Sequence, residues 1–431
     1  MIDRRLAFDV VAAGAGPAGI AAACLAAESG LRTAILDATP WVGGQIWRGQ
    51  EAKRTSGAAR RWLDRLNASG AQVIRQAAVV DAPRPGALLV ETPEGVLEVS
   101  WRKLVLAVGA RELFLPFPGW TLPGVVGVGG LQVMVKSGWP LAGKRIVVAG
   151  SGPLLFAAAA EFRSAGADVL LVAEQANLPR LARFGMSLPR LAPRKLVQAA
   201  GYQARLLGIR YRTSCWPVEA RGADRVEAVD LRTGSRTFTL ACDVLACGFG
   251  FSPNPELPRL LGCRVEGGEV RVDDWQETSV SGVYCAGEPT GIGGEDRALI
   301  EGRIAGHAIA GQARRAERLF KARSRTRAFS RAMARGFALR EDVKRLARPE
   351  TIVCRCEDVA YRELAKYGDG RSAKLQTRCG MGPCQGRICG GAVRMIFGWE
   401  PDSSRPPVFP IEVAALRESG ADPGAPSPGR G

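Results

Sequence analysis

A glycine pattern near the start of the chain limits the possible folds more than any other stretch. Residues 8–37 contain a short apolar strand, a glycine turn, an alanine-rich helix and a second strand that ends at Asp37. The turn has the spacing Gly14-x-Gly16-x-x-Gly19. In such a unit the first glycine permits a tight turn, the second lets the backbone approach a pyrophosphate, and the third lets helix pack on strand. The sequence therefore predicts a Rossmann unit and an α/β fold.

The residues around this turn predict a dinucleotide site. The helix begins at Pro17 and Ala18, where backbone N–H groups and the helix dipole favour a phosphate. Asp37 stands near the offset at which an acid accepts hydrogen bonds from ribose hydroxyls. FAD and NAD share this pattern, so the turn alone does not decide between them. The residues expected at the site are Gly14, Gly16, Pro17, Ala18, Gly19 and Asp37.

Three later stretches add to the first site. Residues 39–49 carry a glycine pair, 104–112 form a strand that ends in a small-residue turn, and 278–306 form a strand, a glycine loop and a helix. The third stretch places Glu288 beside a helix N-terminus, which suits a ribityl hydroxyl and the flavin pyrophosphate. The residues expected to line the cofactor here are Gly43, Gly44, Gln45, Gly109, Gly287 and Glu288.

A second segment, 143–175, repeats the pattern with a change. Gly150-x-Gly152 forms the turn and Glu174 ends the second strand, but Leu155 replaces the third glycine. Glu174 would favour a free ribose 2′-hydroxyl over a 2′-phosphate. NAD binding is one interpretation. A degenerate unit that serves as a scaffold, or that holds only an adenine nucleotide such as ATP, fits the residues equally well.

Together these segments resemble the two-dinucleotide-binding flavoproteins of the glutathione-reductase-like superfamily. The resemblance implies a split FAD domain over 1–125 and 240–313, with an inserted nucleotide-binding domain over 126–239. The usual final acid of that family is aspartate, whereas this chain has Glu288. There is no Cys-x-x-Cys pair before residue 350, which argues against disulfide reduction. His307, the only histidine, is expected to be a packed helical residue, so catalytic residues stay unassigned.

Composition excludes several other classes. The net charge of +17 could suggest nucleic acid, but only 6% of residues are aromatic and they do not alternate with basic residues as stacking platforms do. We therefore expect no nucleic-acid partner. No apolar run reaches the roughly 18 residues of a membrane span. Residues 1–27 resemble a signal peptide, but Asp9 interrupts the run and cleavage would remove the glycine turn. We expect this segment to be retained.

The cysteines form two groups. Six lie singly in apolar segments, as buried reduced thiols do: Cys24, Cys215, Cys242, Cys247, Cys263 and Cys285. The other five lie between Cys354 and Cys389. This distribution indicates a reducing, cytoplasmic compartment with one cysteine-ligated site.

A basic segment connects the nucleotide units to the cysteine group. Over 314–350, Phe329, Met333 and Phe337 are spaced four residues apart and would form one apolar stripe on a helix. We expect a helical linker that packs on the flavin domain and ends at Pro349.

The cysteine-rich segment, 351–400, predicts a metal centre. Cys354-x-Cys356 and Cys384-x4-Cys389 are separated by a helical segment, and a unit this small needs a metal for stability. From spacing alone, a structural zinc and an iron–sulfur cluster are equally compatible.

The segment resembles the [2Fe–2S] domain of the bacterioferritin-associated-ferredoxin type, through "CRCE" and "TRCGMGPCQGRICG". The resemblance implies a [2Fe–2S] cluster on Cys354, Cys356, Cys384 and Cys389. Cys379 would then be a spare thiol. The following residues, 401–431, form a tail that is rich in proline and glycine at its end and is expected to be largely disordered there.

The order of these parts resembles the α subunit of heteromeric flavin-dependent amino-acid and opine dehydrogenases. The matching stretches are "GGQIWR", "PFPGWTLPGV", "AGEPTGIGG" and "GMGPCQGRIC". The resemblance implies a flavoprotein β subunit, similar to D-amino-acid oxidase, that oxidises a C–N bond, and a small ferredoxin-like subunit. This chain would relay electrons through FAD, or a nucleotide in its place, and the cluster. The alternatives are a stand-alone NAD(P)H-dependent reductase and a structural scaffold for a partner.

Overall fold

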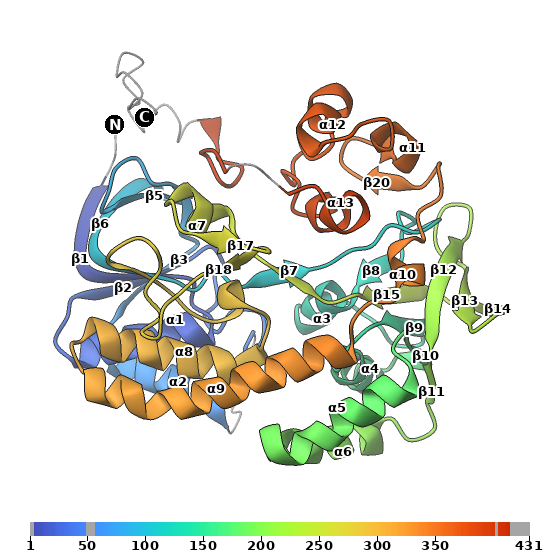
Figure 1. Ribbon diagram of the computed structural model, residues 1–431, viewed down its shortest axis with the longest axis horizontal. Helices are drawn as coiled ribbons and strands as arrows, with labels where there is room; N and C mark the ends of the chain where they lie inside the picture. The colour runs from blue at the N-terminus through green and yellow to red at the C-terminus, as the bar shows by residue number, and fades with distance from the viewer. Residues whose placement is uncertain (1–3, 49–56, 401–403, 414–431) are drawn as a thin grey trace. The chain divides into compact units, whose positions relative to one another are not determined.

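The computed structural model describes residues 4–48, 57–400 and 404–413, which form two compact units (Figure 1). Unit 1 comprises the described parts of 1–109, 254–320 and 403–431, and unit 2 comprises those of 110–253 and 321–402. The tail end predicted to be disordered lies outside the described residues.

These units begin and end at residues other than the predicted domain borders. Strand β8 (Val125–Gly127) pairs with β15 (Val244–Gly248), and β15 pairs with β9 (Arg145–Gly150). Both flanking strands therefore belong to the inserted sheet, so residues 110–125 and 240–253 group with the second unit. Pairing between strands far apart in the sequence decided which sheet they joined.

Unit 1 is built on a parallel sheet. In the order β3-β2-β1-β6, each strand is parallel to its neighbour, and β19 extends the parallel set on β6. Strands β5 and β4 continue from β6 with antiparallel pairing. The strands of this sheet are β1 (Arg4–Ala13), β2 (Thr33–Asp37), β3 (Gln72–Arg75), β4 (Ala78–Asp81), β5 (Ala87–Thr92), β6 (Gly95–Leu106) and β19 (Val283–Cys285), and a separate antiparallel pair is formed by β17 (Val265–Glu266) and β18 (Glu269–Val270).

Two helices of unit 1 pack closely beside the sheet. Helices α1 (Pro17–Glu28) and α8 (Gly294–Ile309) lie against each other, as Figure 1 shows. A β-carbon on Gly302 would stand 2.2 Å from the carbonyl oxygen of Ala18, so glycine permits this approach. The close packing fixes the loop before α8 relative to the glycine turn before α1. The other helices are α2 (Ala58–Ala68), α7 (Glu256–Leu260) and the short η1 (Glu288–Thr290).

Unit 2 contains a second parallel sheet and a small antiparallel one. The parallel order is β11-β10-β9-β15-β8, and β12, β13 and β14 form the antiparallel sheet. The remaining strands are β7 (Ala110–Glu112), β10 (Asp168–Glu174), β11 (Arg210–Thr213), β12 (Cys215–Arg221), β13 (Ala228–Thr233), β14 (Arg236–Ala241) and β16 (Phe251–Pro253). The helices are α3 (Val128–Lys136), α4 (Leu154–Ser164), α5 (Leu178–Leu191) and α6 (Pro193–Arg205).

The cysteine-rich segment packs within unit 2. Its elements are β20 (Ile352–Cys354), β21 (Val359–Ala360), α11 (Tyr361–Leu364), α12 (Gly370–Thr377) and α13 (Cys389–Phe397). The Trp120 indole donates a hydrogen bond of 2.6 Å to the carbonyl of Ile352, and Ile388 packs on the core of the inserted domain. The small segment thus has contacts with the inserted domain in addition to a hydrophobic cluster of its own, which includes Val353, Val359 and Leu364.

The predicted helical linker is interrupted. Helix α9 (Ala313–Gly336) ends before Phe337, and an extended stretch leads to the short α10 (Glu341–Lys344). Phe337 therefore does not continue the helical stripe, although Phe329 and Phe337 both pack on Phe184 of unit 2. The helix ends at Gly336, which lies so close to the Phe184 side chain that a β-carbon would stand 2.9 Å from it.

Two expectations from composition are confirmed. The six isolated cysteines are buried and form no disulfide, as expected of reduced core thiols. Among the described residues, no helix combines the length and the apolar character that crossing a bilayer requires.

The third glycine of the first turn offers a test of the fold. A β-carbon on Gly19 would lie 1.9 Å from the carbonyl oxygen of Gly14, whereas one on Gly16 would meet no described atom within 4 Å. We predict that Gly19→Ala destabilises the protein by about 1–3 kcal/mol because the helix must shift. The matched Gly16→Ala change should cost less than about 1 kcal/mol. Urea unfolding followed by circular dichroism measures both, and equal effects would contradict the packing described.

Candidate cofactor sites

The first glycine turn lies at the carboxyl end of β1 and has the geometry that a dinucleotide requires. Gly14 has φ +112°, a conformation that favours glycine, and the turn leads directly into α1. The side of Gly16 on which a β-carbon would project is open with respect to the described residues. The N-terminus of α1 and this open side are the two features that favour a phosphate group at a glycine turn.

Asp37 lies beside the turn, as predicted. Its Oδ2 accepts a hydrogen bond of 2.6 Å from the backbone N–H of Ala15, and its Oδ1 accepts from the N–H and hydroxyl of Thr39. The carboxylate is only partly buried. It is therefore fixed in orientation and still accessible to a ribose hydroxyl.

The glycine pair after β2 packs against the same turn. The N–H of Gly43 donates to the carbonyl of Ala15 at 2.8 Å, and a β-carbon on Gly44 would stand 3.1 Å from the α-carbon of Gly16. The Gln45 side chain is exposed and accepts a hydrogen bond from Arg48. Gly43 and Gly44 thus line the turn, while Gln45 lies at the surface.

Gly109 and Gly287 follow the ends of β6 and β19, which are parallel neighbours of each other, and β6 also pairs with β1. Gly109 has φ +69°. A β-carbon on Gly287 would stand 3.1 Å from the Ala18 β-carbon at the start of α1. Because parallel strands end at the same edge, the structure gathers these residues with Asp37 and the first turn.

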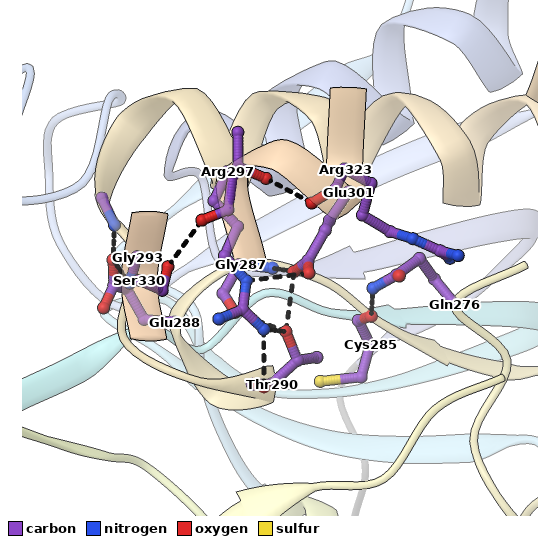
Figure 2. A network of polar contacts seen from close by, with 12 residues as sticks. Gln276, Cys285, Gly287, Glu288, Thr290, Gly293, Arg297, Glu301, Arg323 and Ser330 are labelled. Carbon is purple, nitrogen blue, oxygen red and sulfur yellow. Dashed lines mark hydrogen bonds and ion pairs between the residues drawn. The ribbon is translucent and has the colours of Figure 1, made fainter. Parts of the chain in front are cut away.

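Figure 2 shows how the loop after β19 is held. Buried Glu301 accepts hydrogen bonds from the N–H of Gly287 at 3.1 Å, the Thr290 hydroxyl at 2.7 Å and the Arg297 guanidinium at 2.9 Å. Arg297 also donates to the carbonyl of Thr290 at 2.7 Å. A buried pair with this many hydrogen bonds is costly to break, by about 3–5 kcal/mol when one partner is removed. These hydrogen bonds therefore hold the loop in place.

Glu288 lies at the N-terminus of α8, as predicted. Its Oε1 accepts from the N–H of Gly294 at 2.7 Å and more weakly from that of Gly293. Burial raises the pKa of this carboxyl above its ordinary value, while the two N–H groups lower it. Sequence reasoning missed Glu301 and Arg297; their spacing of four on one helical face was the available signal.

The second glycine turn differs from the first at its acid. Glu174 is 0% exposed, and its two oxygens accept hydrogen bonds of 2.8 Å from the N–H groups of Gly152 and Ala176. Burial raises its pKa to about 7. Leu155, at the third glycine position, is buried in the core of this domain. The buried Glu174 carboxylate thus stabilises the glycine turn by accepting a hydrogen bond from its Gly152 N–H.

The cysteine segment brings its sulfurs together. The Sγ atoms of Cys354, Cys379 and Cys389, all buried, lie within 4.8 Å of one another. Hydrogen bonds from the Cys379 and Cys389 thiols lower the pKa of Cys354 well below its ordinary value. Cys356 is exposed, and its thiol contacts Cys384. Two of the four predicted ligands thus lie in the buried trio, and the other two form a pair.

Cys379 is the residue that the sequence interpretation set aside. It lies between α12 and the loop that carries Cys384, after Arg378 ends the helix in a left-handed conformation. The prediction of a spare thiol did not anticipate its contact with Cys354 and Cys389. The donor set of closely placed thiols fits a soft metal or an iron–sulfur cluster.

His307 is packed, as expected. It is 7% exposed, and its Nδ1 lies 2.9 Å from Oε1 of Gln312. Burial and three neighbouring arginines lower its pKa. The structure gives it no place at the glycine turn.

Comparison with known proteins places this architecture in a family. Residues 8–313 match the family described as pyridine nucleotide-disulphide oxidoreductase. In an alignment of 460 positions, the chain is 33% identical to the opine oxidase A subunit of Rhizobium meliloti (strain 1021), covering 95% of this chain and 99% of that one. It is 32% identical to the HcnB subunit of hydrogen cyanide synthase from Pseudomonas protegens, covering 90% and 91% of the two chains.

Solved structures show the same fold. L-proline dehydrogenase from P. horikoshii superposes with a TM-score of 0.67 at 18% identity, over 96% of this chain and 80% of that one. T. acidophilum thioredoxin reductase gives a TM-score of 0.55 at 21% identity, over 71% of this chain and 99% of that one. The two-dinucleotide-binding α/β fold expected from the glycine turns is confirmed.

The raised pKa of Glu174 predicts a pH dependence. A carboxyl whose pKa is higher in the folded protein stabilises the fold at low pH, and this contribution is lost as the pH rises from about 4.5 to about 7. Relative to Glu174→Gln, the wild-type protein should therefore lose on the order of 2 kcal/mol of stability between pH 5 and pH 8. Urea unfolding at several pH values measures the difference. The exposed Glu227→Gln is the matched control, and a pH-independent difference would contradict the burial.

Proposed function

We propose that the chain, which belongs to the pyridine nucleotide-disulphide oxidoreductase family, is the electron-transferring α subunit of a heteromeric flavin-dependent dehydrogenase. Its similarity in sequence to the A subunits of opine oxidases supports this proposal. Such an enzyme would oxidise the C–N bond of an amino acid, an imino acid or an opine. The observation that carries the proposal is the similarity to two kinds of enzyme subunit over almost the whole chain, cysteine segment included.

Family membership implies a flavoprotein with FAD and nucleotide-binding units. The first site fits FAD because its glycine turn is open at Gly16 and its acid is accessible. The first turn, with Gly14, Gly16 and Asp37, would hold the adenosine and pyrophosphate, and the loop with Gly287 and Glu288 would face the ribityl chain. When bound, FAD supplies the step from two-electron to one-electron transfer.

We propose that Cys354, Cys356, Cys384 and Cys389 bind a [2Fe–2S] cluster. Cys354 and Cys389 lie in the buried trio, and the contact between Cys356 and Cys384 gives a second pair of thiols. A [2Fe–2S] cluster takes two ligands on each iron, so two pairs suit it better than a single trio. When bound, the cluster supplies a one-electron carrier. Cys379 stays in our proposal as a neighbouring thiol.

Substrate oxidation is assigned to a partner. The one histidine of the chain is packed against Gln312, and the residues at the first turn serve binding. We propose a D-amino-acid-oxidase-like flavoprotein β subunit as the partner that removes electrons from the amine, with a small ferredoxin-like subunit as a further component. We also propose a cytoplasmic location, because the six isolated cysteines form no disulfide and a reducing compartment keeps such thiols free.

The subunit proposal predicts activity only in a complex. The chain expressed alone should bind flavin and iron and show no oxidation of amino acids or opines with an artificial acceptor. Co-expression with a D-amino-acid-oxidase-like protein encoded beside it should give a co-purifying complex that oxidises one of these substrates. A chain that turns over the amine alone at the rate of the complex would contradict the proposal, as would a chain without flavin and iron.

The ligand proposal predicts which cysteines retain iron. After anaerobic purification, Cys354→Ala and Cys384→Ala should each reduce the iron content to less than half of the wild-type value, with loss of the visible absorption of the cluster. Cys379→Ala should retain both. Iron analysis and electron paramagnetic resonance of the reduced protein measure these outcomes. Loss of iron in Cys379→Ala together with its retention in Cys384→Ala would instead place Cys379 in the ligand set.

A further inference from the structure

The second Rossmann unit ends at an edge that the chain itself covers. Residues 337–340, here called the covering segment, link α9 to α10 and lie over the carboxyl ends of β9 and β10. In an open α/β sheet this edge is where a nucleotide binds. The residue after β9 is Ser151, in the glycine turn, and the residue after β10 is Gln175. Both belong to the place where the adenosine half of NAD would lie.

These two side chains are bound to the backbone of the covering segment. The Ser151 hydroxyl donates to the carbonyl of Phe337 at 2.9 Å. The Gln175 amide donates to Ser151 Oγ at 2.9 Å and to the carbonyl of Ala338 at 3.2 Å, and its Oε1 accepts from the N–H of Arg340 at 3.1 Å. Gln175 is 0% exposed. Its donor and acceptor are thus both used by the covering segment and the turn.

The covering segment is anchored at both ends. On one side, Phe337 packs on Phe184 with ring centroids 5.2 Å apart. On the other, the Arg340 guanidinium lies over the Trp216 ring at 4.8 Å, and Leu339 and Val343 pack into the hydrophobic core of the domain. Moving the segment would expose these apolar contacts to water and remove two hydrogen-bond partners of the buried Gln175 amide, the carbonyl of Ala338 and the N–H of Arg340, which costs free energy.

The acid of the second unit is inaccessible. A ribose needs a carboxylate that it can reach, but Glu174 is fully buried, and there its oxygens accept from the N–H groups of Gly152 and Ala176. Asp37, at the same position of the first unit, is partly exposed. The two units share one fold, and only the first presents an accessible acid. The residues present therefore do not fit NAD, although a second nucleotide is what the family implies.

We infer that the covering segment 337–340 occupies the adenosine end of the second Rossmann unit, so that this unit binds no nicotinamide dinucleotide and NAD(P)H does not deliver electrons to the chain. The unit then serves as the support on which the linker and the cysteine segment rest. This inference goes beyond the proposed function, since it removes one route of electron entry and leaves the partner subunit as the source.

Two measurements on the full-length protein test the inference. The first is titration with NADH to about 1 mM, the upper end of ordinary enzyme–substrate affinities, followed by energy transfer from tryptophan to bound NADH. We expect no saturable signal, whereas an NADH-dependent flavoprotein of the same family should give one under the same conditions. Saturable binding of NADH by the wild-type chain would overturn the inference.

The second measurement is hydrogen exchange of peptides that cover 337–340. In Gln175→Ala, the N–H of Arg340 loses its acceptor, and exchange in these peptides should be at least about tenfold faster, as expected when about 1.4 kcal/mol of protection is lost. Gln198→Ala, an exposed change on α6, is the matched control and should leave exchange unchanged. Unchanged exchange in Gln175→Ala would show that the segment is not held as described. Neither measurement depends on flavin, iron or a partner, so its failure is distinct from failure of the proposed function.

Discussion

The structure depends on a very close approach of backbone at the first glycine of each turn. A β-carbon on Gly14 would stand 2.3 Å from the carbonyl oxygen of Ala107, and one on Gly150 would stand 1.9 Å from that of Gly248. Both glycines have a positive φ. This contact places the end of the first strand against the end of its parallel neighbour in each sheet, and it sets the edge at which a nucleotide can be bound.

The two units share this geometry but differ at the carboxyl edge of the sheet, where a nucleotide can bind. In unit 1, Asp37 orients the turn while one side of its carboxylate stays accessible, and the buried Glu301–Arg297 pair holds the loop after β19 in place. In unit 2, Glu174 is buried behind the turn. The same fold can therefore present a cofactor site in one unit and a structural support in the other, because the fold alone does not determine function.

In the cysteine segment, the spacing of the cysteines is a local feature, whereas the positions of their sulfurs depend on long-range packing. The Cys-x-Cys and Cys-x4-Cys spacings were visible in the sequence and predicted one site with four cysteines, of which Cys354 and Cys389 lie in the buried trio. Spacing could not show that Cys379 joins them, because α12 and the loop after it determine where that sulfur points. Nor could it show that the segment receives a hydrogen bond from Trp120, or that its own Ile388 packs on the core of the inserted domain, because these contacts join residues far apart in the sequence.

Features whose residues are close along the chain could be predicted from the amino-acid order: the two glycine turns, the acids at the ends of β2 and β10, and the paired cysteines. The spacing of residues predicts these features because steric limits on φ restrict which residues can form a turn, and because a turn involves only a few consecutive residues. Long-range packing settled which sheet β8 and β15 join, how Glu301 secures its loop, and what covers the second turn. The contact between Ser151 and Phe337 spans 186 residues, and no local rule specifies it. Such contacts arise when packing of distant segments brings buried polar groups together and each of them must find a hydrogen-bond partner.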